Sequence, residues 1–291
     1  MDIYNGVKTM LIKEYPLRRN GISLHLDCMS DGKSLRNILL VHGATISSQE
    51  FDINYEDYSL ARRLVREGYA VWRIDIAGYG QSGAVADGFL PDSEYAAEDI
   101  CAAVQCILRE TGQVKIDLLG WSWGTVTAGR FTASHPELVN KLVLYAPIIS
   151  GIGKTAVSEP FHHNTWEQAA DDFQRNAAGA FDEAITDPIV LELWCSSCWH
   201  HDGEYSPNAA WRDISVDRSE ILIDFTRIAV PTLVICGDKD PYLNYSLIDT
   251  ALSNLPAGSN LEVIKGASHC AFVEKPYHQD FQNRLVQFLL Q

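Results

Sequence analysis

The sequence predicts an α/β fold with a mainly parallel central sheet that is covered by helices on both faces. Two observations support this prediction. Short continuous apolar runs, typical of buried parallel strands, alternate with segments of helical periodicity. Loops containing glycine or proline separate the two kinds of segment. Because ligands of such sheets bind outside the carboxyl ends of the strands, we expect the functional residues in loops that follow strands.

The first half of the chain predicts an antiparallel start followed by alternating strands and helices. Residues 9–15 and 22–28 are predicted strands, and the Asn20-Gly21 pair between them is a strong hairpin signal. Further strands are predicted at 37–41, 69–75, 114–119 and 142–145, and helices at 58–66, from 92 or 93 to 112, and at 125–134.

Residues 149–229 do not follow this pattern. They contain four tryptophans and four histidines but no strand-like run, so we predict a mostly helical insertion. Strands are predicted again at 230–236 and 261–264, with a helix at 247–252 between them. A last helix has Phe281, Leu285, Val286 and Leu289 on one face. The predicted organisation is a core made of residues 1–148 and 230–291, with 149–229 inserted into it.

Composition limits the partners. The formal net charge of −15 in 291 residues repels nucleic acid and anionic membranes, so we expect neither as a partner. A small neutral or cationic substrate fits this charge better.

The sequence predicts a cytoplasmic protein. No apolar run approaches the roughly 18 residues of a membrane span, and residues 1–6 have neither the basic start nor the apolar segment of a leader peptide. The seven cysteines predict no disulfide framework, and the oligomeric state stays open between monomer and homodimer.

One five-residue stretch, Gly120-Trp121-Ser122-Trp123-Gly124, lies between a predicted strand and a predicted helix. Glycines two positions before and after a serine permit a sharp turn, because a Cβ at either place would crowd the neighbouring backbone. A helix that starts at Trp123 directs its positive dipole end and unpaired N–H groups toward charge that develops at Ser122. The stretch therefore predicts a nucleophilic serine.

A serine nucleophile needs a base and a group that orients the base. His269 follows the last predicted strand in a loop of small residues, so it is the predicted base. Asp240 is the predicted orienting acid; Asp238 is the alternative, although it is better placed to bond within its own turn. The predicted oxyanion donors are the backbone N–H groups of Trp123 and Ala44, with Thr45 as second choice.

These motifs resemble the α/β-hydrolase superfamily: His-Gly after an early strand, G-x-S-x-G, a late G-x-x-D and a terminal G-x-x-H. The resemblance covers roughly residues 20–148 and 230–291 and implies a Ser-His-Asp centre. It also implies that the insertion, which follows strand six of that fold, is a helical cap over the active site. His42 is expected to brace the oxyanion loop. Asp75 and Ser82 belong to a loop that is structural in the superfamily.

The expected activity is hydrolysis of a carboxylic ester or lactone of a small-to-medium neutral substrate through an acyl-enzyme. The alternatives are a carbon–carbon hydrolase or lyase that uses the same triad, and a hydrolase-like ligand receptor. We expect neither cofactor nor metal; Cys195, Cys198, His200 and His201 could suggest a metal site, but a serine hydrolase needs none. The predicted substrate-binding residues are Thr45, Trp121, Trp166, Trp194 and Trp199.

Overall fold

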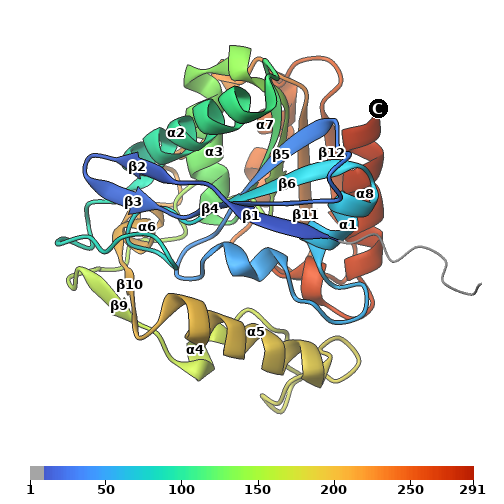
Figure 1. Ribbon diagram of the computed structural model, residues 1–291. Coiled ribbons are helices and arrows are strands. Elements are labelled where there is room, and N and C mark those ends of the chain that lie inside the picture. Colours follow the sequence, from blue (N-terminus) through green and yellow to red (C-terminus); the bar gives the residue numbers. More distant parts are fainter. Residues whose placement is uncertain (1–9) are drawn as a thin grey trace, which may run out of the picture.

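The computed structural model describes residues 10–291, which form a sheet of eight strands flanked by helices (Figure 1). The strand order is β1-β4-β6-β5-β7-β8-β11-β12. The six strands β6, β5, β7, β8, β11 and β12 run parallel to one another. Strands β4 and β1 add an antiparallel edge beside β6. The predicted mainly parallel sheet is confirmed. The strands are β1 (Leu11–Glu14), β4 (Leu26–Ser30), β5 (Arg36–Val41), β6 (Tyr69–Ile74), β7 (Ile116–Trp121), β8 (Val139–Tyr145), β11 (Thr232–Gly237) and β12 (Asn260–Ile264).

The start of the chain contains more strands than predicted. The predicted strand at 9–15 begins at Thr9, which lies outside the described residues. Pro16 follows β1, and the chain then forms a separate hairpin from β2 (Leu17–Arg19) and β3 (Ile22–Leu24). Asn20 and Gly21 close this hairpin with φ values of 50° and 81°, the left-handed backbone that an Asn-Gly turn favours. The predicted turn is therefore present, but β1 pairs with β4.

Helices cover both faces of the sheet. On one face lie α2 (Ser93–Thr111), α3 (Trp123–Ser134) and α7 (Tyr245–Asn254), and on the other lie α1 (Leu60–Arg66) and α8 (His278–Leu290) (Figure 1). Alternate residues of β5 divide between the two hydrophobic cores: Leu39 and Val41 pack into one, Ile38 and Leu40 into the other. Within residues 10–291, no helix has both the length and the apolar character that a membrane span requires.

Residues 149–229, here called the cap, contribute no strand to the central sheet. They contain α4 (Trp166–Ala169), α5 (Pro188–Asp202) and α6 (Ala209–Ile214), as well as a two-stranded ribbon of β9 (Phe161–His163) and β10 (Tyr205–Pro207) (Figure 1). This ribbon was not predicted, because strands of three residues are too short to show an alternating pattern. The boundaries at 149 and 229 stay a prediction. Short 3₁₀ helices complete the described chain: η1 (Ser48–Phe51), η2 (Pro136–Leu138), η3 (Phe225–Arg227) and η4 (Ala271–Val273).

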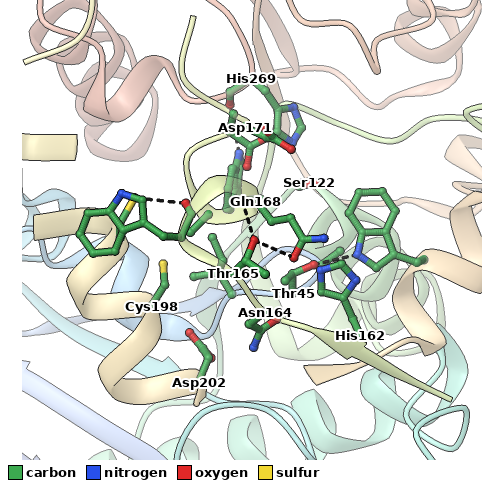
Figure 2. Close-up of a pocket in the computed structure, with 18 of the residues that line it drawn as sticks. Thr45, Ser122, His162, Asn164, Thr165, Gln168, Asp171, Cys198, Asp202 and His269 are labelled. Atoms are coloured by element: carbon green, nitrogen blue, oxygen red, sulfur yellow. Dashed lines mark hydrogen bonds between the residues drawn. The ribbon is translucent and has the colours of Figure 1, made fainter. Parts of the chain in front are cut away.

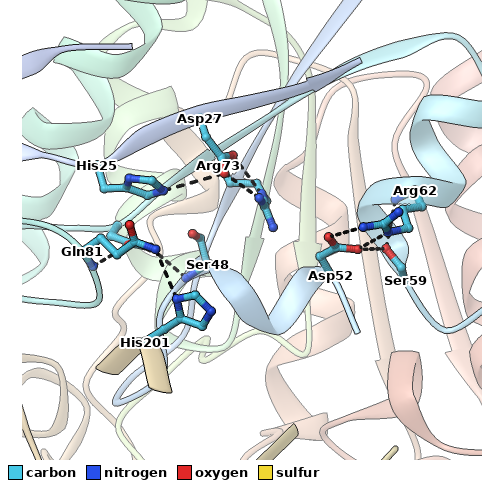
Figure 3. Close-up of polar contacts among 10 residues, drawn as sticks. His25, Asp27, Ser48, Asp52, Ser59, Arg62, Arg73, Gln81 and His201 are labelled. Atoms are coloured by element: carbon cyan, nitrogen blue, oxygen red, sulfur yellow. Dashed lines mark hydrogen bonds and ion pairs between the residues drawn. The ribbon is translucent and has the colours of Figure 1, made fainter. Parts of the chain in front are cut away.

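A buried ion pair joins the antiparallel edge to the parallel part of the sheet. Asp27 of β4 lies directly opposite Arg73 of β6, and the Arg73 Nε donates to Asp27 Oδ1 at 2.9 Å (Figure 3). Their side chains are 4% and 2% exposed. Burial by itself would raise the pKa of Asp27, but His25, whose Nε2 lies 3.7 Å from Asp27 Oδ2, and the charge of Arg73 outweigh it and lower that pKa. The carboxylate therefore stays charged inside the protein.

Replacing one partner of this pair should destabilise the fold strongly. In Asp27→Ala the Arg73 guanidinium stays buried without a countercharge, so the free energy of unfolding should fall by about 3–5 kcal/mol. Urea titration followed by circular dichroism measures the change. The matched control is Glu94→Ala, which breaks the exposed Arg130–Glu94 pair at 3.5 Å and should cost less than about 1 kcal/mol. Equal losses in the two variants would contradict the interpretation.

Candidate active site

The turn between β7 and α3 consists of Ser122 alone. Its backbone has φ 55° and ψ −124°, a conformation that L residues rarely adopt. A Cβ on Gly120 would overlap the Gly124 carbonyl, and a Cβ on Gly124 would lie 2.5 Å from the carbonyl oxygen of Val41. The structure therefore contains the sharp strand-to-helix turn that the two glycines predict. The strand continues two residues further than predicted, so the turn is tighter.

The loops after β11 and β12 bring Asp240 and His269 together. The Nδ1 atom of His269 lies 2.9 Å from Asp240 Oδ2, and the two side chains are 4% and 1% exposed. Burial opposes the charged imidazole, but the charge and hydrogen bond of Asp240 outweigh burial, and the pKa of His269 is raised. Asp238, the alternative acid, was expected to bond within its own turn, but it accepts the Gly266 N–H of the turn after β12 at 2.6 Å. The geometry favours Asp240 as the orienting acid.

The backbone of His269 is fixed by two aromatic donors. Its carbonyl accepts the indole N–H of Trp121 at 3.1 Å and the hydroxyl of Tyr145 at 2.9 Å. The ring of Trp121 also lies beside the imidazole, with 5.3 Å between the ring centroids. Trp121 therefore holds the histidine loop, a role that its position before Ser122 did not reveal.

Ser122 and His269 line one cavity of about 210 Å³ between the core and the cap (Figure 2). The core side of this cavity also includes the predicted residues Ala44, Thr45 and Trp121. The enclosed position separates the serine and the histidine from bulk water, which strengthens electrostatic interactions there. The cap supplies the other wall, with residues His162, Asn164, Thr165, Trp166, Gln168, Ala169, Asp171, Asp172, Cys195, Cys198, Trp199, Asp202, Trp211 and Ile214.

The loop after β5 lies against the serine turn. A Cβ on Gly43 would be 3.1 Å from the Ser122 Cβ, so glycine allows this close approach. The buried His42 holds the loop: its Nδ1 lies 2.8 Å from the Gly43 carbonyl, and its Nε2 lies 3.1 Å from the Ile76 N–H. A carbonyl can only accept and an amide N–H can only donate, so the ring is neutral with its proton on Nδ1. Burial lowers the pKa of His42 in agreement with this role.

The two predicted oxyanion donors occupy suitable places. Ala44 lines the cavity next to Ser122, and Trp123 is the first residue of α3, where helical N–H groups have no partner inside the helix. Their action on an oxyanion stays a prediction.

Glu50 is a further residue of the loop after β5 that the sequence did not indicate. Its side chain is buried, with the residue 2% exposed, and its Oε1 accepts the Gly43 N–H at 3.3 Å. Burial raises the pKa of Glu50.

Thr45 connects the loop after β5 to the cap. Its φ is 79°, which is unusual for a β-branched residue. Two cap side chains hold it: the Trp211 indole donates to Thr45 Oγ1 at 2.7 Å, and the Ser206 hydroxyl donates to the Thr45 carbonyl at 2.8 Å. The Trp123 indole donates to the carboxylate of Asp213, also in the cap, at 3.2 Å. The cap thus supports Thr45, which follows the predicted donor Ala44, and Trp123, which is itself a predicted donor.

Three of the four predicted substrate-binding tryptophans line the cavity, namely Trp121, Trp166 and Trp199. Trp194 does not, and this part of the prediction needs correction. Its ring is buried against Trp121 and Phe272, at centroid distances of 6.0 and 5.7 Å, and its N–H bonds the Ala169 carbonyl at 2.8 Å. The cavity face of α5 is formed by residues three and four apart, Cys195, Cys198, Trp199 and Asp202.

The cap cysteines Cys195 and Cys198 are buried, and burial raises the pKa of both thiols. His201, further along α5, contacts Gln81 (Figure 3). In residues 10–291, no group of three or more His, Cys, Asp or Glu side chains is arranged so that it could hold a metal ion.

Comparisons with known proteins agree with the motifs. The sequence model of the family described as "Serine aminopeptidase, S33" matches residues 32–276. A putative non-heme chloroperoxidase from Synechocystis is 25% identical, over 80% of this chain and 84% of that protein. A putative esterase/lipase from Haemophilus influenzae is 24% identical, over 81% of this chain and 78% of the relative. The solved structure of an esterase from Exiguobacterium antarcticum superposes with a TM-score of 0.69 and 20% identity, covering 95% of this chain and 98% of the other.

The reactivity of Ser122 should depend on pH through His269. Protonated His269 cannot accept the serine proton, so labelling by a fluorophosphonate should slow about tenfold per pH unit below a midpoint above 6.5. In Asp240→Asn the midpoint should move to lower pH, because the charge that raises the pKa is lost while burial still lowers it. Rate constants measured from about pH 5 to about pH 9 test this.

The matched control for this measurement is Asp238→Asn, which removes a carboxylate from the same loop but not from the imidazole. Its midpoint should equal that of the wild type. An unchanged midpoint in Asp240→Asn would contradict the assignment of Asp240.

Proposed function

We propose that this chain, which belongs to the family described as Serine aminopeptidase, S33, and thus to the α/β-hydrolases, cleaves a carboxylic ester or lactone through an acyl-enzyme. The observation that carries the proposal is the Asp240–His269 hydrogen bond of 2.9 Å in the cavity that Ser122 also lines. A small-to-medium substrate fits a cavity of about 210 Å³. The formal net charge of −15 disfavours anionic substrates, nucleic acids and anionic membranes.

In the proposed reaction the Ser122 Oγ attacks the carbonyl carbon, and its proton passes to His269 Nε2. Asp240 keeps the imidazole in the required orientation and stabilises its positive charge. The carbonyl oxygen becomes an oxyanion, which the backbone N–H groups of Trp123 and Ala44 stabilise. When the intermediate collapses, the bond to the alcohol oxygen breaks, and His269 protonates that oxygen.

The acyl group is then bound to Ser122. A water molecule gives a proton to His269 and attacks the acyl carbon. When the second tetrahedral intermediate collapses, the bond between the acyl carbon and Ser122 Oγ breaks, His269 returns the proton to Oγ, and the acid is released. The relative named a putative esterase/lipase supports an ester as the substrate. An ester also needs no cofactor for this sequence of steps.

Two alternatives use the same residues. A carbon–carbon hydrolase or lyase would have a cap that binds a diketone or a related substrate, and a ligand receptor would bind without rapid turnover. The Asp240–His269 pair argues against pure binding, because a buried, hydrogen-bonded base has no evident use in a receptor.

A fluorophosphonate should label the wild-type protein covalently and should not label Ser122→Ala, because among the described residues that line the cavity of the Asp240–His269 pair Ser122 is the one serine. Mass spectrometry measures the adduct. Ser134→Ala is the matched control, since this exposed serine ends the same helix, α3, and its loss should leave labelling unchanged.

Turnover of esters, lactones and β-diketones then identifies the reaction. We expect ester or lactone hydrolysis that falls by at least about 10³-fold in Ser122→Ala. Cleavage of diketones without ester turnover would favour the carbon–carbon hydrolase, and a wild type that resists labelling would exclude the serine mechanism.

A further inference from the structure

Three acidic residues of the cap, Asp171, Asp172 and Asp202, line the cavity of Ser122 but have no part in the proposed reaction. Asp202 is the last residue of α5. In Figure 2 its carboxylate points into the cavity, across from His269 and Asp171. Both carboxylate oxygens are buried, and neither has a hydrogen bond of regular geometry to another described residue. Asp202 therefore presents an acid to whatever occupies the cavity.

This position is unfavourable for a carboxylate in the empty protein. A buried charge without a countercharge is costly, and the C-terminal end of a helix carries partial negative charge that disfavours an anion further. The Ser47 hydroxyl and the Gly80 N–H lower the pKa of Asp202, but burial, together with the charge of Asp75, raises it to about 8. A cation placed beside Asp202 would remove this cost and restore the charged form.

The rest of the cavity wall fits a cation. The described residues that line it include no lysine or arginine. A bound cation therefore does not compete with a permanently charged side chain for Asp202. Trp199 lies three residues before Asp202 on α5 and also lines the cavity, as do the aromatic rings of Trp166, Trp211 and Tyr242. Aromatic faces attract cations, and they do so more strongly when water is excluded.

We propose that Asp202 and the tryptophans beside it bind an ammonium group of the substrate while Ser122 attacks an ester carbonyl at the other side of the same cavity. This inference rests on the proposed function. It replaces the neutral substrate that the sequence predicts with a cationic ester. The ammonium group is primary or quaternary, and the two are separated by the test.

Binding can be tested without turnover. In Ser122→Ala, calorimetry should show that choline binds at least about tenfold more tightly than its neutral isostere 3,3-dimethylbutan-1-ol, because only the cation pairs with Asp202. Ethanolamine, compared with propan-1-ol, tests a primary ammonium in the same way. Adding Asp202→Asn should remove the advantage of the cation over its isostere.

Asp187→Asn is the matched control, because Asp187 caps the opposite end of the same helix, does not line the cavity, and can be replaced by asparagine as a cap. It should keep the preference for the cation. If neither cation binds more tightly than its isostere, or if the preference survives Asp202→Asn, the inference is wrong. Thermal unfolding of the variants confirms that they are folded.

Hydrolysis gives the second measurement. The wild type should hydrolyse a choline ester with a kcat/KM at least about tenfold above that of the 3,3-dimethylbutyl ester, and Asp202→Asn should make the two equal, mainly through the KM of the choline ester. Turnover of both esters without preference would keep the proposed function and overturn the subsite. Cation binding without turnover of any ester would keep the subsite and overturn the proposed function.

Discussion

The backbone of Ser122 is held at φ 55° and ψ −124°, which costs a residue with a side chain about 1–3 kcal/mol. Such a conformation persists only when its surroundings fix it. The Ser122 N–H donates to the Tyr145 carbonyl at 3.0 Å, while the Thr125 N–H and hydroxyl both donate to the Ser122 carbonyl, at 2.9 and 2.5 Å. Because β7 lies between β5 and β8, the turn is at the middle of the sheet edge, and the loops after β5 and β12 can approach the serine from both sides.

The cap and the core meet at the loop that should stabilise the oxyanion. Thr45 keeps its positive φ while it receives hydrogen bonds from two cap residues, Trp211 and Ser206. If the cap moved away, Thr45 would lose both donors, and its strained backbone would be free to relax. The position of the cap and the geometry of the loop at Ala44 are therefore coupled. Substrate that holds the cap closed would also hold the oxyanion loop in place.

The fold and the positions of the candidate catalytic residues could be predicted from the sequence because they depend on local patterns. Parallel strands bring their carboxyl ends to one edge, so Ser122, Asp240 and His269 follow from the order of strands and short motifs. The cap wall could not be predicted in this way. Trp194 and Trp199 belong to one helix and were both expected in the pocket, yet only Trp199 faces it, because helix rotation depends on packing against the core. The place of Asp202 in the cavity wall appears only when the cap and the core come together.

Ser122 and Asp202 line the same cavity, and both lower the stability of the folded protein. Ser122 does so through its strained backbone, and Asp202 through the burial of an acid without a countercharge. Two extensive hydrophobic cores, one on each face of the sheet, provide the stability that allows such costs. Residues that cost stability persist where function selects them. The low dielectric that makes Asp202 costly when the cavity is empty also strengthens its attraction to a bound cation, so the same burial that destabilises the free protein favours the complex.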